Sequence, residues 1–375
     1  MALSPRDVEY MAQALRLAER GCYTTMPNPQ VGCLLVKDDQ VIAEGWHIRA
    51  GEGHAEVNAL TAAGEKARGA TAYVSLEPCS HTGRTGPCAL ALAEAGVVRV
   101  VYAMEDPNPQ VSGQGIEMLR AAGVLVDGPL LEDDARALNP GFIKRMTRKL
   151  PYVRCKMAMS LDGRTAMASG ESKWISNPKA RTDVQRMRAR SCAVISGIES
   201  VLQDNPSLNV RAAELDLPNA EAAAAKQPLR VILDSHLRLP RNAFLLGHES
   251  PILVVHNGAE ANQDKLVDWP AHVEFLALPA RDGRINLEAL LRELALRQCN
   301  EVLLETGATL AGSFLRRGLL DEIIIYMASK LMGSNARPLF DLPIDNMNAA
   351  LALKITDMRA LGQDWRITAM PDTEY

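Results

Sequence analysis

The sequence lacks the features that mark membrane, secreted and nucleic-acid-binding proteins. No uninterrupted apolar run is long enough to span a bilayer. The N-terminus carries Arg6, Asp7 and Glu9 and has no apolar core of the kind found in signal peptides. A formal net charge of -4 argues against a general nucleic-acid binder, which would show a basic face. We therefore expect a cytoplasmic protein that acts on small molecules, without nucleic-acid or membrane partners.

Disulfide bonds are also not expected. Seven cysteines is an odd number, and no feature indicates an extracellular protein. Metal ligation or simple burial explains them better, and five of them have no evident chemistry and are expected to be buried small hydrophobic residues. These five are Cys22, Cys33, Cys155, Cys192 and Cys299. Low-complexity sequence is confined to residues 220–225, which we expect to form a surface loop or helix end.

The length predicts two domains. A chain of 375 residues is more than one compact core usually holds, and its composition is that of an ordinary globular protein. Residues 139–150 (NPGFIKRMTRKL) are predicted to be turn-forming and then basic, and we place the boundary at their end, near Pro151. We therefore expect domains at residues 1–150 and 151–375. No internal repeat relates the two halves.

Hydrophobic periodicity predicts strands that alternate with helices in both halves, and hence α/β domains whose sheets are covered on both faces. In the first half, helices are expected at residues 5–20, 54–68, 88–95 and 115–122, and strands at residues 31–36, 41–46, 71–76, 97–104 and 124–126. In the second half, strands are expected at residues 152–159, 193–196, 230–233, 252–255 and 301–304.

The sharpest local signal is a set of potential zinc ligands. His54-Ala55-Glu56 is followed by Pro78-Cys79 and then by Cys88. One imidazole and two thiolates can hold zinc while a fourth position stays open for water. The metal lowers the pKa of that water, and Glu56 is placed to move its proton to a ring nitrogen and a leaving amine. This pattern is typical of zinc deaminases.

The spacing of the two cysteines departs from the usual deaminase pattern. Residues 80–87 (SHTGRTGP) separate Cys79 from Cys88, where two residues are usual. The insertion is polar and rich in glycine, so it can loop out and still return a thiolate to the metal. The alternatives are a structural zinc site, or buried cysteines beside an unrelated histidine. A structural site normally has four protein ligands, and no fourth is evident close by in the sequence.

Longer motifs carry a resemblance to a known family. Residues 27–32 (PNPQVG), HAE at 54–56, LEPCSHTGRTGPC at 76–88 and EDPNPQVSGQG at 105–115 resemble the bifunctional deaminase/reductase of riboflavin biosynthesis, as do SLDGRTA, ESKWIS, DNPSLNVR and ETGATLAG further along. In that family the longer cysteine spacing is the normal form. The resemblance covers nearly the whole chain. It implies a cytidine-deaminase-like α/β/α sandwich followed by a dihydrofolate-reductase-like domain.

The resemblance implies a first reaction and its substrate contacts. The deaminase acts on 2,5-diamino-6-(5-phosphoribosylamino)pyrimidin-4(3H)-one. Amide, carboxyl and guanidinium groups suit its ring, ribose and phosphate. The implied contacts are Asn28, His47, His81, Arg84, Asp106 and Asn108. Without the resemblance, the two asparagines would be ordinary turn residues. His47 and Arg84 would similarly be solvated surface side chains.

The second half shows only a weak motif of its own. Residues 305–313 (ETGATLAGS) follow an apolar strand and open a helical stretch, where glycines let backbone N–H groups approach a pyrophosphate. The motif is not G-x-G-x-x-G, so a plain strand-to-helix turn is the alternative. Arg188 and Arg211 suit the forked recognition of a phosphate, with surface salt bridges as the alternative. Trp174 could equally be a core residue.

The resemblance adds a second reaction in this half, in which NADPH reduces the ribosyl group of 5-amino-6-(5-phosphoribosylamino)uracil to ribityl. Its implied cofactor contacts are Ala158, Trp174, Ser200, Asp204, Ser235, Gly307, Ala308, Thr309, Leu310, Ala311, Gly312 and Ser313. Its implied substrate contacts are Ser172, Arg188, Leu208, Arg211, Glu305 and Lys156. Lys156 and Glu305 are the expected catalytic pair, which polarises the sugar and manages its proton. A homo-oligomer is expected.

Two other functions stay open at this point. A nucleic-acid base deaminase would share the zinc residues, but it usually keeps the short cysteine spacing and has a basic surface. A degenerate scaffold could retain the fold and bind nucleotides without catalysis. The acidic balance and the longer loop disfavour the first. The presence of His54, Glu56, Cys79 and Cys88 together disfavours the second.

Overall fold

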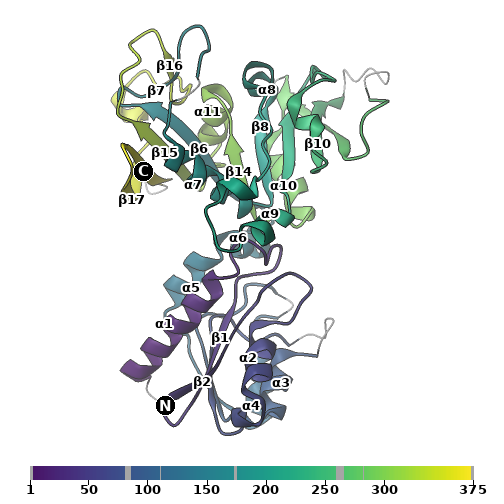
Figure 1. Ribbon diagram of the computed structural model, residues 1–375, viewed down its shortest axis with the longest axis vertical. Coiled ribbons are helices and arrows are strands. Elements are labelled where there is room, and N and C mark those ends of the chain that lie inside the picture. The colour runs from purple at the N-terminus through teal and green to yellow at the C-terminus, as the bar shows by residue number, and fades with distance from the viewer. Residues whose placement is uncertain are drawn as a thin grey trace. The chain divides into compact units, whose positions relative to one another are not determined.

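The computed structural model of the protein describes residues 3–80, 86–109, 111–172, 175–258, 266–281 and 283–372. The chain divides into two compact units, Met1–Lys149 and Leu150–Tyr375 (Figure 1). Within the described ranges we find no helix with the length and apolar character needed to cross a membrane.

The first unit alternates helices and strands. Its helices are α1 (Pro5–Glu19), α2 (Ala55–Ala63), α3 (Cys88–Glu94), α4 (Gln114–Ala121), α5 (Glu132–Leu138) and α6 (Pro140–Arg148), with a 3-10 turn at Gly64–Ala67. Its strands are β1 (Gly32–Lys37), β2 (Gln40–Trp46), β3 (Thr71–Val74), β4 (Arg99–Tyr102) and β5 (Leu125–Asp127).

These strands form one mixed sheet in the order β2-β1-β3-β4-β5. β1 pairs antiparallel with β2 and β3, whereas β3, β4 and β5 run parallel. Alternate residues of the strands enter two separate cores, as Leu34 and Leu35 illustrate. Helices α2, α3 and α4 cover one face, and α1 and α5 cover the other (Figure 1). The expected three-layer α/β/α sandwich is confirmed.

Helix α1 is anchored by a buried carboxylate near its start. Ser4 and Asp7 form a capping box, which satisfies backbone N–H groups of the first turn. The same Asp7 carboxylate accepts hydrogen bonds from the Tyr73 hydroxyl (2.6 Å) and the Arg99 guanidinium (2.7 Å). Burial raises the pKa of Asp7, but the bonds from Arg99 and Tyr73 outweigh it and hold the pKa far below its usual range. The carboxylate thus ties α1 to β3 and β4.

The second unit is built on a larger sheet. Its helices are α7 (Pro178–Ala189), α8 (Ile198–Asp204), α9 (Ala220–Ala225), α10 (Leu287–Leu296) and α11 (Ala308–Arg316), with 3-10 turns at Ala212–Glu214, Phe244–Gly247 and Met347–Ala349. Its strands are β6 (Tyr152–Ser160), β7 (Arg164–Ala166), β8 (Ala193–Gly197), β9 (Leu229–Leu233), β10 (Ile252–Asn257), β11 (Val273–Leu278), β12 (Ala280–Arg281), β13 (Arg284–Ile285), β14 (Glu301–Glu305), β15 (Glu322–Ala328), β16 (Arg337–Pro338), β17 (Leu353–Leu361) and β18 (Asp364–Pro371).

The main sheet has nine strands in the order β11-β10-β9-β8-β14-β6-β15-β18-β17. All neighbours from β11 to β15 are parallel, and β18 and β17 extend the sheet antiparallel. Helices α10 and α11 pack on one face, whereas α7 and α8 pack on the other. The loops that leave the parallel strands at their carboxyl ends therefore meet at one edge, where binding clefts of open α/β sheets lie.

The structure corrects several expectations from the sequence. Residues 139–150 are not an open turn, because Pro140 occupies the first turn of α6, where its missing N–H costs nothing. Helix α5 and strands β11, β15, β17 and β18 were not expected, and residues 220–225 form the complete helix α9. The predicted helix at 54–68 ends earlier, at Ala63. Cys22 and Cys192 are only partly buried, whereas Cys33, Cys155 and Cys299 are buried as expected.

Candidate active sites

The first unit brings the three predicted zinc ligands together. His54 lies directly before α2, Cys88 is the first residue of α3, and Cys79 follows β3. One ligand atom from each residue lies within 4.8 Å of the others, and among the described residues the group has these three members. His54 Nδ1 lies 3.3 Å from Cys88 Sγ and 3.6 Å from Cys79 Sγ. The residues converge because α2 and α3 begin at the same edge of the sheet.

The geometry of this group fits a zinc ion. Zinc bonds of about 2.0 Å to nitrogen and 2.3 Å to sulfur, at tetrahedral angles, separate the two ligand atoms by roughly 3.5 Å. The two N···S distances of 3.3 and 3.6 Å bracket that value. Soft sulfur donors with one imidazole are also the set that zinc prefers. His54 would bind through Nδ1, the ring nitrogen that faces both sulfurs.

The two thiols are chemically unequal before a metal binds. A hydrogen bond from Cys88 is the main cause that lowers the pKa of Cys79, to about 4. The same contact raises the pKa of Cys88 far above its usual range. The backbone N–H of Cys88 also donates to Cys79 Sγ at 3.3 Å. Of the two thiols, Cys79 is therefore the one whose surroundings favour the thiolate form.

Glu56 lies in the first turn of α2 and is 3% exposed. Burial, followed by the nearby Cys79 thiolate, raises its pKa to about 7. The nearby Cys88 thiol, one of the three predicted ligands, acts in the opposite direction and lowers the pKa of Glu56. A carboxyl group that touches the ligand shell and is shielded from solvent can exchange protons with a molecule held at the metal.

Asn28 and His47 form a second polar pair beside the ligands. Asn28 Nδ2 lies 3.1 Å from His47 Nε2, and His47 Nδ1 lies 3.0 Å from the Gly53 carbonyl. Because a carbonyl can only accept, Nδ1 carries the proton and Nε2 accepts from Asn28. The rings of His47 and His54 meet edge to face with centroids 5.6 Å apart. His47 is 3% exposed, so it is no surface histidine.

Asp106 and Asn108 lie on the loop between β4 and α4. The Asn108 N–H donates to Asp106 Oδ1 at 2.8 Å, which fixes a local turn. The Asp106 N–H donates in turn to the buried carboxylate of Glu77, two residues before Cys79. Glu77 was not predicted as a site residue from the sequence. The expected contacts His81 and Arg84 lie outside the described residues.

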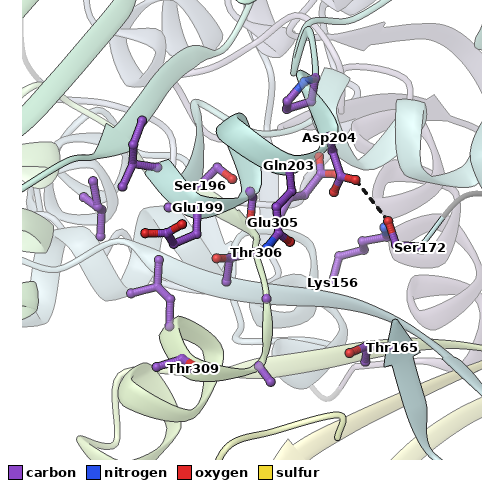
Figure 2. A pocket seen from close by; sticks show the side chains of 18 of the residues that line it. Lys156, Thr165, Ser172, Ser196, Glu199, Gln203, Asp204, Glu305, Thr306 and Thr309 are labelled. Carbon is purple, nitrogen blue, oxygen red and sulfur yellow. Dashed lines mark hydrogen bonds between the residues drawn. The ribbon is translucent and has the colours of Figure 1, made fainter. Parts of the chain in front are cut away.

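The second unit has a large cleft at the carboxyl ends of its parallel strands (Figure 2). Its volume is about 1250 Å³. That exceeds the roughly 300–1,000 Å³ typical of a pocket for one small ligand. It is lined by these expected residues: Lys156, Ala158, Ser172, Arg188, Ser200, Asp204, Leu208, Arg211, Ser235, Glu305, Gly307, Ala308, Thr309, Leu310 and Ser313. Ala311 and Gly312 are not among the lining residues, and Trp174 lies outside the described residues.

Lys156 and Glu305 lie side by side in the floor of this cleft, because β6 and β14 are paired with these two residues in register. Burial lowers the pKa of Lys156, and the charge of Glu305 opposes that shift. Burial works against ionisation of Glu305, but Arg188 outweighs it and holds the Glu305 pKa below its usual range. Arg188 reaches both Glu305 oxygens, at 2.6 and 2.9 Å.

Two further polar pairs line the walls. Ser172 Oγ donates to Asp204 Oδ1 at 3.0 Å, and Lys156 extends toward this pair (Figure 2). Arg211 forms a two-pronged contact with Glu214, with N···O distances of 2.5 and 2.7 Å. A third Arg211 nitrogen donates to Ser207 Oγ at 3.0 Å. The guanidinium of Arg211 is therefore already oriented by its neighbours.

The start of α11 meets the same cleft. Gly307 precedes the helix and supplies no side-chain cap to its first turn, so backbone N–H groups there suit a phosphate. Thr309 and Ser313 add hydroxyl groups to the wall. Ala311 faces the core instead, and a side chain on Gly312 would collide with the Asp341 carbonyl, 2.4 Å from the position of a Cβ. The helix thus offers its first turn, together with Ser313 one turn later, to the cleft.

Comparison with known proteins relates both units to one family. The RibD C-terminal domain family matches residues 151–367. The cytidine and deoxycytidylate deaminase zinc-binding region matches residues 4–104. The chain is 47% identical to riboflavin biosynthesis protein RibD of Escherichia coli K12, over 96% of this chain and 98% of that protein. The chain belongs to the RibD family. It is a bifunctional enzyme of riboflavin biosynthesis, with a deaminase domain and a reductase domain.

Other members of the RibD family agree with this assignment. The RibD protein of Haemophilus influenzae Rd is 48% identical, and the match covers 99% of both chains. The structure of Acinetobacter baumannii RibD (form 1) superposes with a TM-score of 0.90 at 48% identity, over 98% of this chain and 99% of that one. A Thermotoga maritima deaminase/reductase superposes with a TM-score of 0.85 at 33% identity, over 98% of this chain and 99% of that one.

Proposed function

We propose that the first unit deaminates 2,5-diamino-6-(5-phosphoribosylamino)pyrimidin-4(3H)-one with zinc, and that the second reduces the product with NADPH. The observation that carries the proposal is that one chain holds two sites of different chemistry. One is a His54–Cys79–Cys88 group with the buried Glu56. The other is a large cleft with a Lys156–Glu305 pair.

In the deaminase, His54, Cys79 and Cys88 would hold the zinc ion. Bound zinc supplies Lewis acidity, which makes water a usable nucleophile near neutral pH. Glu56 takes one proton from the attacking water and delivers it to the ring nitrogen. It then carries the second proton, from the hydroxyl group now on the ring, to the departing amino group, so that ammonia leaves and a carbonyl oxygen takes its place. Proximity of Glu56 to the ligand shell supports this role.

Substrate contacts in the deaminase follow from the polar groups around the ligands. Asn28 and Asp106 would pair with donors and acceptors of the pyrimidine ring. The hydrogen bond from Asn28 to His47 orients the asparagine amide, and the Asp106–Asn108 turn holds the second side of the site. His81 and Arg84 would meet ribose or phosphate oxygens.

In the reductase, the cleft would take NADPH against the start of α11 and the phosphoribosyl substrate beside Lys156. Bound NADPH supplies a hydride, which the anomeric carbon accepts as its bond to the ring oxygen opens. Arg188 holds both oxygens of Glu305 and keeps the pKa of that carboxyl below its usual range, which makes it a poor proton donor. Burial lowers the pKa of Lys156, and the charge of Glu305 opposes that shift, so the amine next to the carboxylate is the better donor. We therefore assign proton delivery to the ring oxygen to Lys156 and not to Glu305.

In this arrangement we assign the contact with the substrate's phosphate group to Arg211. Arg188 is engaged by Glu305, whereas Arg211 lies on the wall of the cleft with its fork turned to the exposed Glu214. A phosphate group matches the same fork and carries more charge than a carboxylate. Ser172, Leu208 and Asp204 complete the surroundings that we propose for substrate and cofactor.

A coupled assay on the purified chain tests the proposal. The diaminopyrimidinone phosphoriboside is supplied, and ammonia release and then NADPH oxidation are followed. We expect both signals, with ammonia release independent of NADPH. Ammonia release without NADPH oxidation would contradict the reductase half. No ammonia from zinc-loaded protein would contradict the deaminase half.

A further inference from the structure

Glu77 is a buried side chain of the deaminase unit that receives four backbone hydrogen bonds. Its exposed fraction is 3%. Oε2 accepts from the N–H groups of Asp106 (3.1 Å) and Gly113 (3.0 Å). Oε1 accepts from Gly115 (2.9 Å) and Ile116 (3.4 Å). A carboxylate in the interior normally needs a cation or several N–H donors, and here backbone amides supply this compensation.

The four donors come from the loop between β4 and α4 and from the first turn of α4. Asp106 lies in the first half of the loop, and Gly113 is its last residue, so a single oxygen holds both parts of the loop. The other oxygen accepts hydrogen bonds from N–H groups in the first turn of α4. Gly113, the residue before the helix, has no side chain that could cap these groups. Glu77 therefore acts as the N-terminal cap of a helix that lies 36 residues further along the chain.

The same residue is adjacent to the metal ligands. The Glu77 N–H donates to the Met104 carbonyl at 2.9 Å, at the end of the parallel pair β3 and β4. Cys79 follows two residues later. A Cβ on Gly115 would stand 1.9 Å from the carbonyl oxygen of Pro78, so the first turn of α4 is pressed against the segment that carries Cys79.

We propose that Glu77 is a positioning residue of the deaminase, which sets the loop carrying Asp106 and Asn108 at a fixed distance from the ligand Cys79. It acts through that loop and does not touch the substrate. The inference rests on the proposed substrate contacts of Asp106 and Asn108. Rigid support of this kind matters, because a displacement of about 1 Å at a binding group can cost about 100-fold in catalysis.

The test is Glu77→Gln in the full-length, zinc-loaded chain. The amide has one oxygen fewer and turns an NH₂ group toward backbone donors, so the loop loses half of its anchor. We expect the deaminase KM to rise by about 10- to 100-fold. Bound zinc should stay at the wild-type level, and the reductase activity of the same chain should be unchanged. An unchanged KM, or loss of zinc, would overturn the assignment.

Asp7→Asn is the matched control. Asp7 is also a buried carboxylate of this unit with backbone, hydroxyl and guanidinium donors, but it holds α1 and not the substrate loop. We expect this variant to melt at a lower temperature with its KM within about twofold of wild type. If both variants changed KM equally, Glu77 would have a general structural role and the proposal would be wrong.

Two further measurements keep the proposal testable. Asn108→Ala should raise the deaminase KM; if it does not, the substrate contacts are wrong. If the deaminase KM rises in Asn108→Ala but does not change in Glu77→Gln, only the role of Glu77 is contradicted.

If the Glu77 variant does not fold, hydrogen exchange in the wild-type protein decides. The amides of Asp106, Gly113 and Gly115 should exchange as slowly as those of β4, and rapid exchange would overturn the inference.

Discussion

The two active sites of this enzyme use the chain in different ways. In the deaminase unit, three ligands come from the starts of two helices and one loop, and their donor atoms already lie within 4.8 Å of one another. In the reductase unit, the cleft is wide and its charged side chains are paired with one another, as Arg188 is with Glu305 and Arg211 with Glu214.

On the proposed function, the difference follows from what each site would hold. A zinc ion is small and demands a fixed set of distances, so its ligands are placed by local structure and short motifs. A dinucleotide and a phosphoribosyl substrate need a large surface with charges that can change partners on binding. The first site is prearranged before its ligand arrives. In the second site, ion pairs between side chains of the cleft hold the charged groups in position, and these pairs would exchange partners when ligands bind.

The comparison implies that each site can be disabled without the other, and the largest effect is expected from Glu56→Gln. The variant keeps the size of the side chain but cannot move a proton. We expect deamination to fall between about 100- and 10,000-fold with zinc still bound. Ammonia release and metal content are the measurements, with reductase activity as the internal control. Normal turnover would contradict the proton role of Glu56.

A second variant removes the proposed catalytic pair of the reductase. Lys156→Ala combined with Glu305→Gln should lower NADPH oxidation by about 100-fold or more, since proton delivery and its supporting charge are both lost. The deaminated intermediate is supplied directly, so that the first reaction does not limit the rate. Ammonia release from the first substrate should be unaffected. Full reductase activity would refute the assignment.

A smaller effect is expected from pH, because of Asp7. Its pKa lies far below the usual Asp value in the folded chain. Its contribution to stability is therefore complete well above the unfolded pKa of about 3.9 and is lost as the pH falls below it. Asp7→Asn should remove about 1.5–3 kcal/mol at neutral pH. Urea unfolding at pH 7 and pH 3 measures this, and an equal loss at both pH values would contradict the account.

The smallest effect is expected from Arg211→Lys. A lysine keeps the positive charge but loses the fork that now meets both oxygens of Glu214. We expect the reductase KM for the phosphoribosyl substrate to rise by about tenfold with kcat little changed. Reduction kinetics with NADPH held at saturation provide the measurement. A change in kcat alone would place Arg211 elsewhere in the reaction.

The sequence could name the three candidate zinc ligands that the structure brings together, because zinc chemistry dictates residue types and spacing. Only four residues are needed, and the chemistry requires each of them for a separate reason: His54, Cys79 and Cys88 as ligands, and Glu56 to move protons. Glu77 could not be predicted, because its role comes from backbone N–H groups that carry no residue-specific signal and lie at least 29 residues away. The pairing of Arg188 with Glu305 was equally hidden, across 117 residues.

The fold shows the same division. Buried strands such as β8 and β10 stand out as apolar runs, whereas nearly every residue of β17 is exposed, so that strand has no such run. Helix α6 was missed because Asn139 and Pro140 are typical of a turn, although Pro140 is equally suited to a first helical turn. Most elements that face a core carry a local signal, although the apolar, buried strand β15 was missed as well.

Removal of the metal tests most directly whether the two sites work independently. The purified chain is stripped with a strong chelator, and both activities are then measured with their own substrates. We predict that ammonia release falls to background and returns when Zn²⁺ is added, while NADPH oxidation with the deaminated intermediate is unchanged. Ammonia release from metal-free protein, or parallel loss of both activities, would contradict the account.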